Sequence, residues 1–299
     1  MSSWSGKSKG SVLGYKIFVF AIEKTGLGAA YFILRFVSFY YFIFSWKTSS
    51  CLFYYFRKRL HYGPVKSILS IYSNYYLLGQ TLIDKIAVLA GYKTKFTFTI
   101  QGEEYLTQMV KANKGGILIS AHIGNWELAG HVLRGIAAKV NIVMYEGEHT
   151  AIKKYMDSIM KEKNFNLIII NDNGLNHIYE INAALENKEL ICMHGDRFVK
   201  GSKTVLCNFL GEQAFFPLGP FLLATQLQVP VSFVFSIKKS ASHYFLHATP
   251  PVICSTTIGR QQRDTEALSI LKSYVQSLEK IIYQYPNQWF NYYHFWKTT

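Results

Sequence analysis

The sequence is poor in acidic residues and in cysteine. The first shortage makes the chain strongly basic, and the second argues against a disulfide-stabilised or zinc-binding protein. Only 18 of the 299 residues are Asp or Glu, against 32 Lys and Arg, so the formal net charge is +14. The four cysteines are far apart, with no C-x-x-C pair and no zinc-ligand spacing. We therefore expect reduced thiols in a protein that faces the cytosol, without disulfides or a structural metal. Internal repeats and low-complexity linkers are absent as well.

Such a basic chain attracts polyanions, which leaves nucleic acid, anionic lipid headgroups or an acidic carrier protein as partners. The basic residues do not gather into one stripe, and the sequence carries no recognised nucleic-acid-binding motif, so we expect no nucleic acid partner. Apolar residues make up 49% of the chain, and it contains 21 Tyr and 22 Phe. This aromatic content favours contact with lipid in addition to a buried core, because Tyr and Trp prefer the membrane interface.

One apolar segment near the N-terminus is a candidate membrane anchor. The stretch Ala29–Trp46 contains a single charged residue, Arg35, and is slightly shorter than the roughly 20 residues of a spanning helix. Basic residues lie on both sides of it, most densely at 57–59, as expected beside anionic headgroups. We predict an anchoring helical region over 1–60, whose helix dips into one leaflet or crosses it, with the main domain over 61–299 on the cytoplasmic side. The alternative is a buried core helix.

The rest of the chain alternates short apolar runs with segments of helical periodicity. After a long helix predicted over Tyr62–Ala90, strands and helices follow one another, which predicts an α/β fold: a mixed, mostly parallel sheet flanked by helices. The predicted strands are Phe96–Ile100, Gly115–Ala121, Asn141–Tyr145, Leu167–Ile170, Leu190–Met193 and Val229–Phe235. The predicted helices between and after them are Trp126–Ile136, Ile152–Lys163, Asn176–Glu186, Gly219–Leu227 and Asp264–Tyr283.

The most informative segment is SAHIGNWELAG, residues 120–130. His122 follows a predicted buried strand, where α/β proteins place their sites. Glu127 falls in the first turn of the next predicted helix, with Asn125 as its N-cap. From there its carboxylate can fix the imidazole tautomer, which leaves the other nitrogen to deprotonate an attacking hydroxyl. A metal site that adds His131 is the weaker interpretation, because no H-E-x-x-H motif is present, and we expect no metal.

The string AHIGNWELAG resembles the H-x4-[D/E] box of the lysophospholipid acyltransferase superfamily, and more narrowly that of the bacterial lipid A biosynthesis acyltransferases. ICMHGDRFVKG (residues 191–201), FLGEQAFFPLGPFLLATQLQVPVSFVF (209–235) and YPNQWFNYYHFW (285–296) are similar to later family segments in the same order. The resemblance implies that His122 and Glu127 are catalytic. It implies supporting, substrate-binding positions at Gly124, Asn125, Asp196 and Arg197. His194 could face the same cleft or the opposite side of its strand.

The resemblance also implies the reaction and its partners. These are an acyl carrier protein or coenzyme A thioester as donor, a lipid hydroxyl as acceptor, no further cofactor, and the bacterial inner membrane as location. Many relatives carry an arginine where this chain has Glu146 and Glu148, so two acceptors stay open. One is a lipid A precursor. The other is a different lipid, such as a phospholipid, an amino-acid lipid or an aryl-polyene pigment. A membrane-binding paralogue without activity is a further alternative.

Overall fold

The computed structural model describes residues 12–92, 95–126, 128, 139–145, 166–170, 176–199, 201–255 and 259–296. The helix predicted over Ile152–Lys163 and most of the one predicted over Trp126–Ile136 lie outside these ranges. So do Glu127, His131, Glu146 and Glu148.

Seven of the described strands form one sheet in the order β1-β9-β8-β2-β5-β3-β4. Each neighbouring pair is parallel except β8 with β9. The strands are β1 Thr97–Gln101, β2 Gly116–Ser120, β3 Val140–Tyr145, β4 Asn166–Ile170, β5 Leu190–His194, β8 Val231–Lys238 and β9 His243–Ala248. The central strands β2 and β8 are buried along their whole length, as expected for a sheet covered on both faces. The predicted mixed, mostly parallel α/β fold is confirmed.

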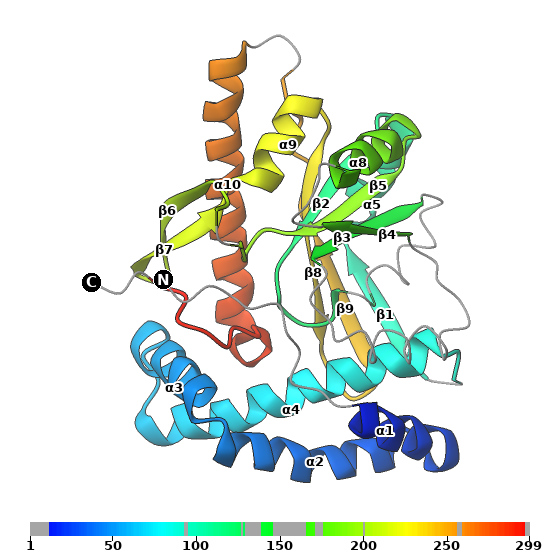
Figure 1. Cartoon of the computed structure of the whole chain (residues 1–299), viewed down its shortest axis with the longest axis vertical. Coiled ribbons are helices and arrows are strands. Elements are labelled where there is room, and N and C mark those ends of the chain that lie inside the picture. The colour runs from blue at the N-terminus through cyan, green and yellow to red at the C-terminus, as the bar shows by residue number, and fades with distance from the viewer. Residues whose placement is uncertain are drawn as a thin grey trace.

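Helices cover this sheet, and one long helix, α10, stands along one side of it beside α9 (Figure 1). α10 turns a stripe of residues three or four apart toward the core, among them Leu271, Tyr274 and Leu278, each fully buried. A separate antiparallel hairpin, β6–β7, packs beside α10 in the same view. These elements and the remaining helices are α5 Glu103–Lys111, α8 Asn176–Glu186, β6 Thr204–Phe209, β7 Glu212–Pro217, α9 Gly219–Leu227 and α10 Arg260–Gln284.

The N-terminal third forms a layer of helices under one end of the sheet (Figure 1). It consists of α1 Val12–Thr25, α2 Leu27–Phe44, α3 Trp46–Tyr54, a π-helical turn over Tyr55–Arg59, and α4 Pro64–Leu89. The apolar segment predicted near the N-terminus is thus a helix, α2, and it lies alongside α4 (Figure 1). α2 buries Ala30, Leu34 and Ser38, which are four residues apart and share one face.

The opposite face of α2 is exposed and aromatic. Phe32, Phe36, Phe39 and Phe44 are each more than half exposed, which is unusual for so many large apolar side chains on one helix. Among the described residues, α2 is the one helix with the length and apolar composition of a membrane span, and 17% of its residues are buried inside the protein. The domain boundary predicted at residue 60 stays a prediction.

Candidate active site

His122 lies just beyond the carboxyl end of β2, and Asp196 lies just beyond the carboxyl end of the neighbouring strand β5. The two strands are parallel and in register, with Ser120 opposite His194. Since parallel strands end at the same edge of a sheet, the residues that follow them meet there, although 74 positions separate them in the chain.

Asp196 is buried and binds His122 at two points. Its Oδ1 lies 2.8 Å from His122 Nδ1, and its Oδ2 accepts a hydrogen bond of 3.0 Å from the His122 backbone N–H. Trp289 Nε1 donates to the same Oδ2 at 3.3 Å. A carboxylate can only accept, so the Nδ1 of His122 carries a proton. In the neutral ring the lone pair is therefore on Nε2, as a general base requires.

Electrostatics keep this pair in the form that a base needs. Burial and the Arg197 guanidinium lower the pKa of His122, and the Asp196 carboxylate partly opposes them. His122 is therefore neutral at neutral pH. Burial alone would raise the pKa of Asp196, but the adjacent His122 ring and Arg197 hold it well below its usual range, so Asp196 is ionised. The His122 side chain is 21% exposed while that of Asp196 is 1% exposed, so the histidine is the member of the pair that is open to solvent.

His194 is the second imidazole of the site. Its ring stacks on His122 at a centroid distance of 4.1 Å, and Trp126 meets it edge-on at 4.6 Å. The ring therefore lies on the same side of its strand as His122, which the sequence left undecided. Burial and the nearby His122 hold the pKa of His194 well below its ordinary value. Two imidazoles this close do not both carry a charge, so His194 is a neutral wall of the site.

Arg197 points toward the C-terminal segment that follows α10. Its guanidinium donates to the backbone oxygen of Phe290 and lies 5.8 Å from the ring centroid of Tyr293. The Phe290 N–H in turn donates to the His122 carbonyl at 2.8 Å, so Arg197 and His122 are braced by the same stretch of chain. Contact of Arg197 with a phosphate or an oxyanion stays a prediction.

Gly124 and Asn125 fix the chain just after His122. The Asn125 N–H donates to the Ser236 carbonyl at 2.7 Å, and its side-chain amide donates to the Thr81 carbonyl of α4 at 2.9 Å. The Gly124 N–H donates to the Gln288 carbonyl at 2.9 Å. These contacts position the backbone of the box. A substrate contact of either residue stays a prediction, as does the role of Glu127, which lies outside the described residues.

Gly124 is required by its conformation and by its neighbour. Its φ is +61°, and a Cβ at this position would overlap the Ser236 carbonyl oxygen of β8. We expect Gly124→Ala to lower the free energy of unfolding by about 1–3 kcal/mol, because it combines left-handed backbone strain with a backbone clash. Urea unfolding followed by tryptophan fluorescence measures this. Gly211→Ala, with φ +77° and open space around it, is the control that has the strain without the clash. Equal losses in both variants would contradict the assignment.

Sequence reasoning missed Trp289, Gln288 and Ser236 as contributors to the site. The density of aromatic residues in 285–296 was the available signal for the first two. In the part of the chain that the structure describes, no group of three or more His, Cys, Asp or Glu side chains is placed to hold a metal ion.

A carboxylate-oriented histidine at the carboxyl edge of a mostly parallel sheet is the arrangement of an α/β enzyme that uses a histidine base. The family model for bacterial lipid A biosynthesis acyltransferases matches residues 72–298, and the chain belongs to this family. It is an acyltransferase. Among solved structures it is similar to the 1-acyl-sn-glycerophosphate acyltransferase from Thermotoga maritima, with 14% identity over 83% of this chain and 95% of that chain and a TM-score of 0.38. A search of curated proteins gave no match.

Proposed function

We propose that the protein is a membrane-associated O-acyltransferase that moves a fatty acyl chain from a thioester to the hydroxyl of a lipid, with His122 as general base. The observation that carries the proposal is the contact between Asp196 Oδ1 and His122 Nδ1. Nε2 takes the proton of the acceptor hydroxyl as its oxygen attacks the thioester carbonyl. The C–S bond breaks as the tetrahedral intermediate collapses, and the thiolate leaves with a proton from the imidazolium.

Charge and family membership support the choice of substrates. The net charge of +14 suits an acidic donor, either acyl carrier protein or coenzyme A. Membership of the family favours a lipid A precursor as acceptor. The acids at Glu146 and Glu148, where many relatives carry an arginine, favour a different lipid acceptor, and this is the second candidate.

An acyl-transfer assay on total lipid separates these candidates. Purified full-length protein in detergent receives labelled acyl carrier protein thioester or acyl-coenzyme A together with total lipid from a Gram-negative bacterium, and His122→Ala is the control. A labelled lipid that forms with wild type alone supports the proposal, and its mass identifies the acceptor. If no labelled lipid forms with either donor from folded protein, the alternative of a membrane-binding paralogue without activity replaces it.

In this proposal α2 lies in the plane of one leaflet and does not cross the membrane. The 18 residues of α2 span about 27 Å, slightly less than the roughly 30 Å of the hydrocarbon core. α2 also packs along α4, which is part of the layer under the sheet, while its outer face exposes aromatic side chains. Arg57 and Lys58, which follow α3 in the same layer, are exposed and suit the anionic cytoplasmic leaflet of the bacterial inner membrane, whereas the neighbouring Arg59 pairs with Glu212 at 2.9 Å.

We expect Phe36→Glu/Phe39→Glu to weaken binding to vesicles of anionic phospholipid by roughly 100-fold or more, because each buried Phe contributes about 1.5–3 kcal/mol. Co-sedimentation with vesicles measures this. Tyr179→Glu is the matched control, since Tyr179 is 73% exposed on α8 at the far end of the molecule (Figure 1). If the double variant bound vesicles as tightly as wild type, α2 would not be the membrane contact.

A further inference from the structure

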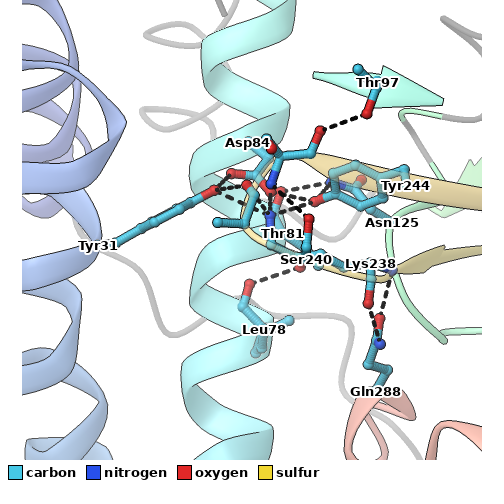
Figure 2. A network of polar contacts seen from close by, with 12 residues as sticks. Tyr31, Leu78, Thr81, Asp84, Thr97, Asn125, Lys238, Ser240, Tyr244 and Gln288 are labelled. Carbon is cyan, nitrogen blue, oxygen red and sulfur yellow. Dashed lines mark hydrogen bonds and ion pairs between the residues drawn. The ribbon is translucent and has the colours of Figure 1, made fainter. Parts of the chain in front are cut away.

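A buried polar cluster adjoins residues 122–125, which we call the catalytic segment, and includes Asn125 of that segment (Figure 2). The ammonium of Lys238, at the end of β8, pairs with the carboxylate of Asp84 on α4. Tyr31 of α2 donates its hydroxyl to one oxygen of Asp84, and Tyr244 of β9 donates to the other. Asn125 completes the group, with its side-chain amide 3.5 Å from the Tyr244 hydroxyl. We refer to these five residues as the Asp84–Lys238 cluster.

The ion pair at its centre is almost completely shielded from water. The side chains of Lys238 and Asp84 are 2% and 0% exposed. Burial raises the pKa of Asp84 and lowers that of Lys238, while their mutual attraction opposes both shifts. An apolar pair of similar size would avoid this desolvation, so the pair is not accounted for by stability alone. What a satisfied buried network does provide is one defined geometry.

The cluster fixes the catalytic segment from two sides. On one side, the Asn125 amide binds the Thr81 carbonyl, one turn before Asp84 on the same helix. On the other side, the Gln288 side chain binds both backbone groups of Lys238, at 2.9 and 2.8 Å. The Gln288 carbonyl accepts the Gly124 N–H, and the next residue, Trp289, donates to Asp196. The chain on both sides of the His122–Asp196 contact is therefore anchored to residues of the cluster or to their direct partners.

Tyr31 brings the N-terminal layer into this network. Its hydroxyl binds Asp84 and also accepts a hydrogen bond of 3.1 Å from Lys238. The Tyr31 side chain reaches the cluster from α2, across the face on which α2 meets α4 (Figure 2). If α2 leaves α4, Asp84 and Lys238 each lose a partner at a buried position.

We propose that the Asp84–Lys238 cluster is a positioning device through which the docking of α2 on α4 sets the geometry of His122 against Asp196. Tyr31, Asp84 and Lys238 are positioning residues in this scheme and touch no substrate. The inference rests on the proposed role of His122 as base and on α2 as the membrane-facing helix.

The test compares two tyrosines of the N-terminal layer, Tyr31 and Tyr54, whose hydroxyls each donate a hydrogen bond to a carboxylate. Tyr31→Phe removes the hydroxyl that binds Asp84. Tyr54→Phe, the matched control, removes a hydroxyl that binds Glu212 of the β6–β7 hairpin at 2.6 Å. In the full-length protein in detergent, we expect Tyr31→Phe to lower kcat by about tenfold or more while KM for the thioester stays within about twofold, because a misplaced base slows chemistry and leaves donor binding intact. We expect Tyr54→Phe to leave both constants within about twofold of wild type.

A second readout does not depend on activity. In protein labelled with ¹⁵N at histidine, the Nδ1 proton of His122 is observed by NMR and assigned through its loss in His122→Gln. We expect this resonance to shift or broaden in Tyr31→Phe and to stay at its wild-type position in Tyr54→Phe. A wild-type resonance and kcat in Tyr31→Phe, or equal changes in both variants, would overturn the positioning role. A changed resonance in Tyr31→Phe alone, with no acyl transfer by any form including wild type, supports the positioning role and refutes the proposed function instead.

Discussion

Replacing His122 by alanine is expected to lower kcat/KM for acyl transfer by about 10²- to 10⁴-fold, the usual contribution of a general base. The loss arises because the acceptor hydroxyl has no base to take its proton as it attacks the thioester. The folded structure is expected to persist, since the His122 side chain is 21% exposed and its backbone contacts to Asp196 and Phe290 do not depend on the ring.

The pH dependence of wild-type activity is expected to reflect the same base. A base works in its neutral form, so kcat/KM rises as the pH increases through the pKa of His122 and is level above it. Because burial and Arg197 lower this pKa from 6.5, the rise is expected below pH 6.5. His177→Ala, on the distant helix α8, is the matched histidine control and should retain wild-type rates. Near-normal turnover by His122→Ala would contradict the general-base mechanism.

The sequence was sufficient to predict the α/β class because its central strands are mostly apolar and its helices have regular periodicity. Gly116–Ser120 and Val231–Lys238 are buried along their whole length, so they read as strands without knowledge of their neighbours. Other elements gave weaker signals. The strand His243–Ala248 was missed, and so was the helix Val12–Thr25, which packs its Val19 and Ile22 in one cluster with Ile83 of α4, a contact that no local pattern encodes.

The candidate site likewise has one part that local sequence predicts and another that depends on the arrangement of distant strands. Local spacing predicts His122 as a candidate base because it follows a buried strand, and the structure places it just beyond the carboxyl end of β2. The contact with Asp196 depends on β5 lying next to β2, and sheet order cannot be read from a chain in which 74 residues separate the two partners. Spacing alone therefore pointed to Glu127 as the partner of the ring, while the described structure has Asp196 on Nδ1. The same limit concealed Trp289, which reaches Asp196 from the last segment of the chain.

The Asp196→Asn substitution is expected to lower kcat/KM by about 10³-fold or more, through the tautomer of His122 and not through its position. The backbone N–H of His122 and the Nε1–H of Trp289 both donate to Oδ2 of Asp196. An asparagine satisfies these two donors by placing its single oxygen toward them. Its amide N–H₂ then faces Nδ1 of His122, which must accept a hydrogen bond. The ring proton moves to Nε2, and that nitrogen can no longer act as a base.

Two measurements distinguish this effect from simple destabilisation. The ¹⁵N chemical shifts of the His122 ring report the tautomer and should show the proton on Nε2 in Asp196→Asn.

The free energy of unfolding should also change with pH in a defined direction. The pKa of Asp196 is held far below its unfolded value of about 3.9, so the carboxylate contributes stability above that pH and loses it as the pH falls. The difference in free energy of unfolding between wild type and variant should therefore be largest near neutral pH and shrink in acid. Asp264→Asn, which removes a half-exposed carboxylate on α10, should show neither effect. If Asp196→Asn turned over within about threefold of wild type with its ring proton still on Nδ1, another group would have to orient His122, and Glu127 is the first residue to test in that case.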